Sequence, residues 1–439
     1  MSNRTSIPRV RALVAGAAAG LLLACAAPAT AAQADGEPAS DGLIPTLPEP
    51  TGRHTVGVTE LHLVQQGRPD PWLPDRDREL MVGIWYPAKA DREARPAPYM
   101  PEGTAEILGA EFTATLGLDP EAIDYGAITS AGLSGAPADT RSGPRPVVLF
   151  SPGGGVSRTL GTALVQELAS HGYVVVTVDH TGEAPVQFPG GRVETSRLDD
   201  MPEDNPYLAM TDARVDDVRF VLDQLEEIAS GDNPDAQGRA LPRGLARVLD
   251  LSRIGAFGHS AGGATSIHAM AEDDRIDAAV DMDGSVVLGR NEAEREAFRE
   301  RFPASTEGVT RPFMFMGAAQ EEIPEEGGEP VVHPNTHVTF EDWGRLWENS
   351  PGWKRDLNFP EARHFTFTDH LLFLPRIQSE LGLPPEVVAS VIGPLPDPGR
   401  AYASQHTYLR AFFDLHLRGL ARPVLDGESP HHPDVRFVP

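Results

Sequence analysis

The sequence is poor in cysteine and in positive charge. Its 439 residues include a single cysteine, so the chain can form no internal disulfide and no zinc site built from several cysteines. Lysine and arginine number 37 against 64 acidic residues, a formal charge of −27. Such a chain is repelled by phosphate backbones and anionic lipid, so nucleic acid is not an expected partner. Hydrophobic residues at 40% suffice for a core and argue against a disordered chain.

Long apolar runs are scarce too, and the N-terminal one is short. Residues 1–32 combine three arginines with an uncharged apolar stretch over 12–27, typical of an export signal and short for a membrane span. Two processing sites compete, because residues 29–31 suit cleavage of a signal peptide whereas the sequence ending at Cys25 resembles a bacterial lipobox. The sequence predicts a secreted protein or a cell-surface lipoprotein whose membrane contact is that N-terminal lipid.

The remaining chain divides by composition. We assign the proline-rich residues 33–52 to a linker, residues 53–422 to one domain and residues 423–439 to a C-terminal tail. Loss of residues 1–32 removes three arginines and no acidic residue, which changes the charge from −27 to about −30.

Short apolar runs that alternate with helical stretches predict the fold. The strand-like runs are 147–150, 173–178, 254–257, 278–282 and 313–316, and the helical stretches include 160–170, 215–228 and 402–417. Such alternation is typical of a mostly parallel sheet with helices on both faces, an α/β fold. Two earlier runs, 55–64 and 80–86, predict an edge hairpin, and residues 97–141 a covering excursion.

A serine lies where a predicted strand turns into a predicted helix. The sequence Gly258-His259-Ser260-Ala261-Gly262-Gly263 has the G-x-S-x-G pattern of a nucleophile elbow, whose glycines remove Cβ atoms that would collide in the sharp turn. Ser260 is therefore the predicted nucleophile; the alternative is a glycine-rich turn that only packs a helix on a strand. His259 must face elsewhere, and we interpret it as structural.

An oxyanion hole needs two backbone N–H groups, one from the residue after the nucleophile and one from the loop after an earlier strand. Ala261 supplies the first. The loop Ser151-Pro152-Gly153-Gly154-Gly155 supplies the second, which we assign to Gly154. A phosphate-binding loop is the rival interpretation, but no lysine of the P-loop pattern follows.

Several segments together resemble the plasma-type, single-chain platelet-activating factor acetylhydrolase family. They are Phe150-Ser151-Pro152-Gly153-Gly154-Gly155, Arg158-Thr159-Leu160, Leu168-Ala169-Ser170-His171-Gly172-Tyr173 and the elbow. The resemblance implies an α/β-hydrolase fold and cofactor-free, metal-free hydrolysis of short or oxidised acyl esters, in some members at the sn-2 position of phospholipids. The family commonly has histidine at the position of Pro152 and a larger residue at that of Ala261. The resemblance therefore supports the family's fold and chemistry for this chain better than it supports the family's substrate.

The resemblance places the catalytic acid at Asp283, directly after the strand-like run 278–282. In this fold the acid follows the serine and precedes the histidine in the chain. Asp281 is a competitor on the same predicted strand. Glu321 is a second competitor, because many other α/β-hydrolases place their acid after the next strand.

The predicted general base is His364, which is followed by Phe367 and Asp369 as in the family. His370 is the alternative candidate for the general base. His333 and His337 have the spacing of a helical zinc pair, but Pro334 breaks the helix that such a pair needs.

These residues predict an exported serine ester hydrolase of the acetylhydrolase type that acts on small-molecule or phospholipid esters with short acyl chains. A general carboxylesterase or polyester hydrolase is the alternative within the fold, and a serine oligopeptidase lacks the length for a propeller gate. A non-catalytic surface binding lipoprotein is the rival from another class. Residues 181–210 are expected to cover the mouth of the site.

Overall fold

The computed structural model describes residues 42–91, 93–201, 204–322 and 331–439, without the side chains of residues 321 and 322. The predicted export signal, with Cys25, lies outside the described residues. The described part of the predicted linker packs on the domain, since the backbone of Leu43 pairs with Ile123 and the side chain of Thr51 hydrogen-bonds Glu167.

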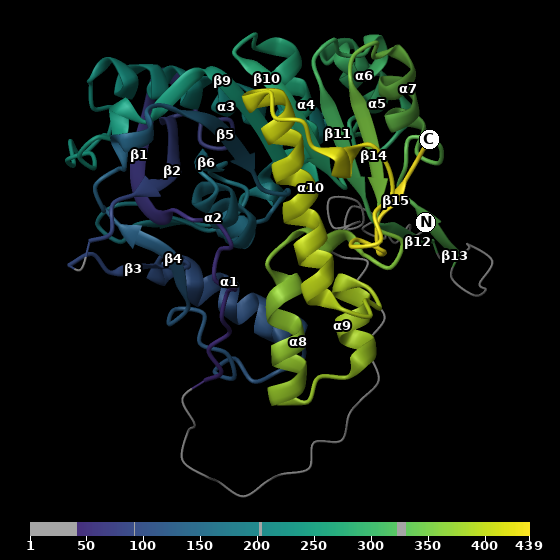
Figure 1. Cartoon of the computed structure of the whole chain (residues 1–439), viewed down its shortest axis with the longest axis horizontal. Coiled ribbons are helices and arrows are strands. Elements are labelled where there is room, and N and C mark those ends of the chain that lie inside the picture. The colour runs from purple at the N-terminus through teal and green to yellow at the C-terminus, as the bar shows by residue number, and fades with distance from the viewer. Residues whose placement is uncertain (1–41, 92, 202–203, 323–330) are drawn as a thin grey trace, which may run out of the picture.

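An eleven-stranded sheet forms the centre, in the order β15-β14-β11-β10-β9-β5-β6-β2-β1-β4-β3 (Figure 1). Its strands are β1 (Thr55–Pro69), β2 (Asp77–Ala88), β3 (Pro96–Pro98), β4 (Thr129–Ser134), β5 (Arg145–Ser151), β6 (Val174–Asp179), β9 (Leu249–His259), β10 (Ile276–Met282), β11 (Phe313–Gly317), β14 (Lys354–Asn358) and β15 (Arg436–Phe437). Two small hairpins pair β7 (Val186–Gln187) with β8 (Val193–Glu194), and β12 (Ala319–Glu322) with β13 (Val331–Pro334).

The six strands from β14 to β6 run parallel, and their register brings their carboxyl ends together. Ser151 of β5 lies beside Gly258 of β9, and His259 lies beside Met282 of β10, which in turn lies beside Met316 of β11. The loops that follow β5, β9, β10 and β11 therefore emerge side by side at one edge of the sheet, the usual place for a site in an open α/β sheet.

Helices cover both faces of the sheet (Figure 1). They are α1 (Glu102–Thr115), α2 (Thr162–Ser170), α3 (Pro206–Ser230), α4 (Ala261–Glu272), α5 (Glu292–Arg301), α6 (Ala304–Glu307), α7 (Glu341–Asn349), α8 (His370–Leu381), α9 (Pro385–Ile392) and α10 (Pro398–Arg418). One core packs α2 and α10 against the sheet, and a second packs α3, α4, α5 and α7 against it. The central strands are largely apolar and almost completely buried, which confirms the predicted α/β fold.

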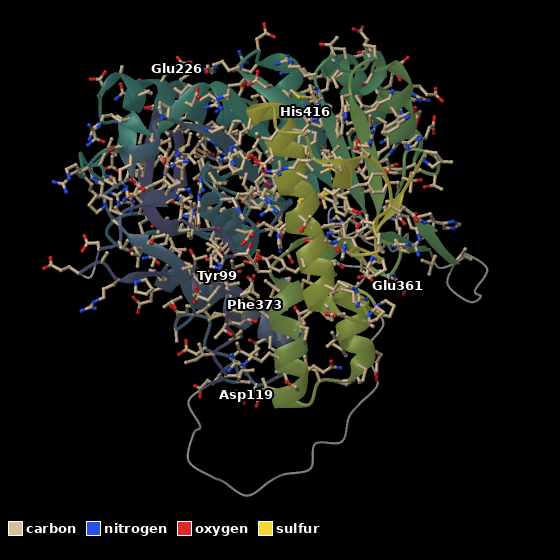
Figure 2. All side chains as sticks on the ribbon, viewed as in Figure 1. Tyr99, Asp119, Glu226, Glu361, Phe373 and His416 are labelled. Atoms are coloured by element: carbon tan, nitrogen blue, oxygen red, sulfur yellow. The ribbon has the colours of Figure 1, made fainter. Side chains whose placement is uncertain are left out.

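A third apolar cluster joins α1, α8 and α9 at one end of the molecule (Figure 1). Tyr99 and Phe373, both labelled in Figure 2, belong to it. Their rings meet edge to face with centroids 5.3 Å apart. No helix among the described residues has the length and apolar character needed to cross a bilayer.

Two predictions about the sheet margins need correction. The hairpin of β1 and β2 forms as expected, but it is not the edge, because β4 pairs in parallel with β1 and β3 follows. Residues 97–141 thus contribute to the sheet as well as covering it. At the opposite margin, part of the predicted tail forms β15, which pairs with β14 and follows the buried Val435.

Candidate active site

Ser260 occupies a strained turn between β9 and α4. Its φ of 56° lies in the region that side chains disfavour, and its N–H is held by the backbone oxygen of Met282 at 2.9 Å. The flanking glycines are required by close packing. A Cβ at Gly262 would lie 1.9 Å from the backbone oxygen of Ser151, and one at Gly258 would lie 2.3 Å from the backbone of Gly262. The turn presents a half-buried serine at the carboxyl end of the sheet.

Asp283 and His364 meet at the same edge. Asp283 follows β10 with a φ of 61°, and its Oδ2 accepts a hydrogen bond from Nδ1 of His364 at 2.7 Å. Its Oδ1 accepts bonds from the Ala318 N–H and from Nδ2 of Asn335, both at 2.8 Å. Burial alone would raise the pKa of Asp283, but the bonds from His364, Asn335 and Ala318 outweigh it and lower that pKa. The carboxylate is therefore ionised and holds His364 with its proton on Nδ1.

His259 links the serine turn to the loop that carries His364. Its Nε2 donates to the backbone oxygen of His364 at 3.0 Å, and the two rings lie 4.5 Å apart. Burial lowers the pKa of His259 well below its ordinary value, so the ring is neutral. His259, which directly precedes Ser260, thus holds the His364 loop next to the serine turn. This role agrees with its interpretation as structural.

The competing acids lie in other surroundings. Asp281 is fully buried, its Oδ1 accepts from the Gly284 N–H at 2.8 Å, and burial raises its pKa well above the ordinary value. A Cβ at Gly263 would lie 1.9 Å from that oxygen, so Asp281 packs under α4. Glu321 lies on β12, and its side chain is outside the described part of the structure.

The competing histidines also have other partners. His370 is buried and stacked 4.0 Å from the ring of Phe112, and burial lowers its pKa to about 3. His337 donates from Nδ1 to Asp356 at 2.7 Å, while His333 lies on β13. Within the described residues no three His, Cys, Asp or Glu side chains gather as a metal ion would require.

The predicted oxyanion loop packs against the serine turn. A Cβ at Gly153 would lie 3.3 Å from the Cβ of Ser260, and one at Gly154 would lie 3.8 Å from the Cβ of Ala261. Ala261 is the first residue of α4, where backbone N–H groups have no partner within the helix. The structure thus brings together all five residues assigned to the site from the sequence.

An apolar cluster flanks Ala261. Its buried members are Trp72, Met210 and Ala213, and its partly buried members are Leu198, Met201, Tyr207, Ala261 and Leu288. Four of them belong to residues 181–210, the segment predicted to cover the mouth of the site, so that segment does pack beside the serine turn.

Sequence reasoning missed the buried polar groups beneath the oxyanion loop. Arg214 of α3 donates to the backbone oxygens of Pro152 and Gly153, and it pairs with the buried Glu183. His180 bonds Asp217 of α3 at 3.0 Å and Ser151 Oγ at 3.3 Å. The sequence offered no clear signal for them, because Arg214 and Asp217 are two of several charged residues along α3.

A strained serine between a parallel strand and a helix, at the carboxyl edge of a doubly covered sheet, defines an α/β-hydrolase. Comparison with known proteins agrees. The family described as "Platelet-activating factor acetylhydrolase, isoform II" matches residues 44–188. A probable 1-alkyl-2-acetylglycerophosphocholine esterase of Arthroderma benhamiae is 28% identical over 89% of this chain and 93% of that protein. Platelet-activating factor acetylhydrolase of Cavia porcellus is 27% identical over 54% of this chain and 55% of its own length.

Among solved structures, a ferulic acid esterase from Streptomyces cinnamoneus is 36% identical to this chain. The match covers 90% of this chain and 99% of the esterase, with a TM-score of 0.68. The chain is thus similar to the platelet-activating factor acetylhydrolase family, and the protein is a carboxylic ester hydrolase.

Proposed function

We propose that the protein is an exported serine ester hydrolase that cleaves short-chain acyl esters through Ser260, His364 and Asp283. The observation that carries this proposal is the 2.7 Å bond from His364 Nδ1 to Asp283 Oδ2. That bond leaves Nε2 as the basic nitrogen of the ring, at the edge where the strained Ser260 turn emerges.

The chemistry runs in two halves. The Ser260 hydroxyl attacks the acyl carbon and passes its proton to Nε2 of His364, while the N–H groups of Gly154 and Ala261 stabilise the negative oxygen of the tetrahedral intermediate. His364 then protonates the departing alcohol, which leaves an acyl group on Ser260. Water, deprotonated by His364, attacks this ester and releases the carboxylic acid. Asp283 remains ionised and orients the imidazole, and no step calls on a cofactor.

Short acyl groups are proposed from the apolar cluster and the charge. The small side chain of Ala261 lies against the apolar cluster, which places apolar side chains beside the proposed oxyanion hole. The formal charge of −27 keeps the enzyme away from anionic bilayers. We therefore propose dispersed esters of roughly two to six acyl carbons, among them sn-2 acetyl or oxidised phospholipids, by analogy with the acetylhydrolase relatives.

Aromatic acyl esters form the second candidate, within the class of general carboxylesterases. The observation that favours them is the 36% identity to a ferulic acid esterase over 99% of that structure. Trp72 and Tyr207 of the apolar cluster supply aromatic surface beside Ala261.

One panel separates the two candidates. We would compare p-nitrophenyl acetate, an sn-2 acetyl phospholipid and methyl ferulate under one set of conditions, with Ser260→Ala as the blank. Short-chain specificity requires the acetyl esters to have the higher kcat/KM, and a higher kcat/KM for methyl ferulate would favour the second candidate. Retained activity of the Ser260→Ala enzyme on every ester would rule out a mechanism with Ser260 as the nucleophile.

We also propose export, with either free secretion or a lipid on Cys25. The support is the N-terminal sequence alone, in which an arginine-containing start precedes an uncharged apolar stretch. Labelling of cells with a fatty acid probe tests the anchor. A lipoprotein incorporates the label, and Cys25→Ser abolishes it; an unlabelled protein in the medium indicates cleavage at residues 29–31 instead.

A further inference from the structure

One buried arginine donates hydrogen bonds to the backbone of the oxyanion loop. Arg214 of α3 is 1% exposed; its Nη1 donates to the backbone oxygen of Pro152 at 2.7 Å and its Nη2 to that of Gly153 at 3.0 Å. The other edge of the guanidinium is held by Glu183, which accepts from Nε at 2.8 Å and from Nη2 at 2.5 Å. The planar guanidinium is thus fixed by a carboxylate on one side and donates hydrogen bonds to two successive backbone carbonyls on the other.

Those two bonds determine where the neighbouring N–H groups point. In a trans peptide the carbonyl and the N–H point in opposite directions, and the described residues contain no cis peptide bond. Because the Gly153 carbonyl faces Arg214, the Gly154 N–H faces away from it. The loop packs against the serine turn, since a Cβ at Gly153 would lie 3.3 Å from that of Ser260.

The loop itself has little preference for this orientation. Glycine adopts positive and negative φ almost equally, so a Pro-Gly-Gly-Gly sequence can turn its peptide planes at small cost. A rotated peptide would direct the Gly153 carbonyl, instead of the Gly154 N–H, at the developing oxyanion, and its partial negative charge would oppose the reaction.

We propose that Arg214 is a positioning residue that fixes the direction of the Gly154 N–H and so forms half of the oxyanion hole. The proposal rests on the proposed function, in which Gly154 donates to the tetrahedral intermediate. Glu183 acts through Arg214 by anchoring the guanidinium.

A second arginine supplies a matched control. Arg418 of α10 binds two successive backbone oxygens, those of His171 at 3.2 Å and Gly172 at 2.7 Å, and it pairs with Asp414 at 2.9 Å. It therefore also binds two successive carbonyls and one carboxylate, at the turn between α2 and β6. Lysine keeps the charge in either position but cannot hold a carboxylate and two carbonyls in one plane.

The experiment compares the kinetics of Arg214→Lys and Arg418→Lys on p-nitrophenyl acetate, together with the melting temperatures of the two variants. It also measures their affinity for a trifluoromethyl ketone, an inhibitor that forms a tetrahedral adduct with serine. Loss of one oxyanion donor lowers kcat by about 10²–10³-fold in known enzymes. We expect Arg214→Lys to lower kcat by about 10²-fold with KM changed less than about threefold. The affinity for the ketone should fall by the same factor as kcat/KM. Arg418→Lys should keep kcat within about threefold of the wild type.

If Arg214→Lys does not fold, Glu183→Gln replaces it, because the amide keeps the shape of the carboxylate while weakening the anchor; a fall in kcat of about tenfold or more is expected. The proposal is overturned if Arg214→Lys and Arg418→Lys have equal kcat while Ser260→Ala is inactive. Where Glu183→Gln is used instead, a kcat equal to that of the wild type overturns it. Full activity of Ser260→Ala would instead overturn the proposed function, and this inference with it.

Discussion

His259 donates a hydrogen bond from Nε2 to the backbone oxygen of His364 at 3.0 Å, so the residue before the candidate nucleophile holds the loop of the candidate base. The bond joins two segments that are 105 positions apart in the sequence. Its geometry matters because a displacement of about 1 Å in a catalytic group can lower the rate by about 10²-fold.

His259→Phe should therefore lower kcat by about 10- to 10²-fold while the fold persists, since an aromatic ring still packs at this position but the hydrogen bond is lost. Steady-state kinetics and thermal melting measure both quantities. His268→Phe is the control, because His268 is also buried and also bonds a backbone oxygen, that of Val286 at 2.9 Å. Equal kcat in the two variants would show that the His259 bond serves stability alone.

Asp283→Asn should lower kcat by about 10⁴-fold, because an amide at this position favours the wrong tautomer of His364. Asp281→Asn and Glu321→Gln should keep most of the activity, because Nδ1 of His364 is already bonded to Asp283, and Asp281 accepts from the Gly284 N–H instead. Kinetics of the three purified variants provide the measurement. A larger loss in Asp281→Asn or Glu321→Gln than in Asp283→Asn would reassign the acid.

The buried Asp281 should make the enzyme less stable as the pH rises from about 4 toward neutrality. Burial raises its pKa in the folded chain, whereas the unfolded chain releases this proton near pH 3.9. Over that range the folded state binds more protons, so the free energy of unfolding falls with pH. Asp281→Asn removes this slope, and urea unfolding at pH 5 and pH 7 should show a larger relative gain for the variant at pH 7. Parallel stability curves for variant and wild type would contradict the assignment of a neutral Asp281.

The acyl preference predicts how rate depends on chain length and on substrate aggregation. Across p-nitrophenyl esters, kcat/KM should peak at roughly two to six acyl carbons, because relatives of this chain are named as hydrolases of acetyl esters. The rate should show no jump at the critical micelle concentration, since the acidic surface gains nothing at an anionic interface. Faster hydrolysis of sixteen-carbon than of four-carbon esters, or a sharp rise above that threshold, would indicate an interfacial lipase.

The sequence predicted the elements that depend on local pattern. Most of the parallel strands contain short, largely apolar runs and the serine turn is a compact motif, so the α/β fold was predictable and is confirmed. The roles of Ser260, Asp283 and His364 stay predictions, although the structure places them at one edge of the sheet. The strand β4 was missed because its residues, Thr129–Ser134, are mostly small and partly exposed, without the apolar pattern of a buried strand.

The groups that orient the site depend on tertiary packing. Arg214 is one of several charged residues on α3, and only the packing of that helix against the oxyanion loop distinguishes it from a solvated arginine. Asn335 directly follows β13, and it reaches Asp283 because the β12–β13 hairpin returns the chain to the end of β11. No local pattern encodes either contact.

The most direct test of the central claim is covalent labelling of the serine. A fluorophosphonate should modify the full-length enzyme once, the modified peptide should contain Ser260 by mass spectrometry, and hydrolysis of p-nitrophenyl acetate should be lost in proportion to labelling. Asp283→Asn and His364→Ala should label far more slowly, because the hydroxyl is then not activated. An enzyme that stays unlabelled and active, or that is labelled elsewhere while Ser260→Ala retains its rate, would contradict the account.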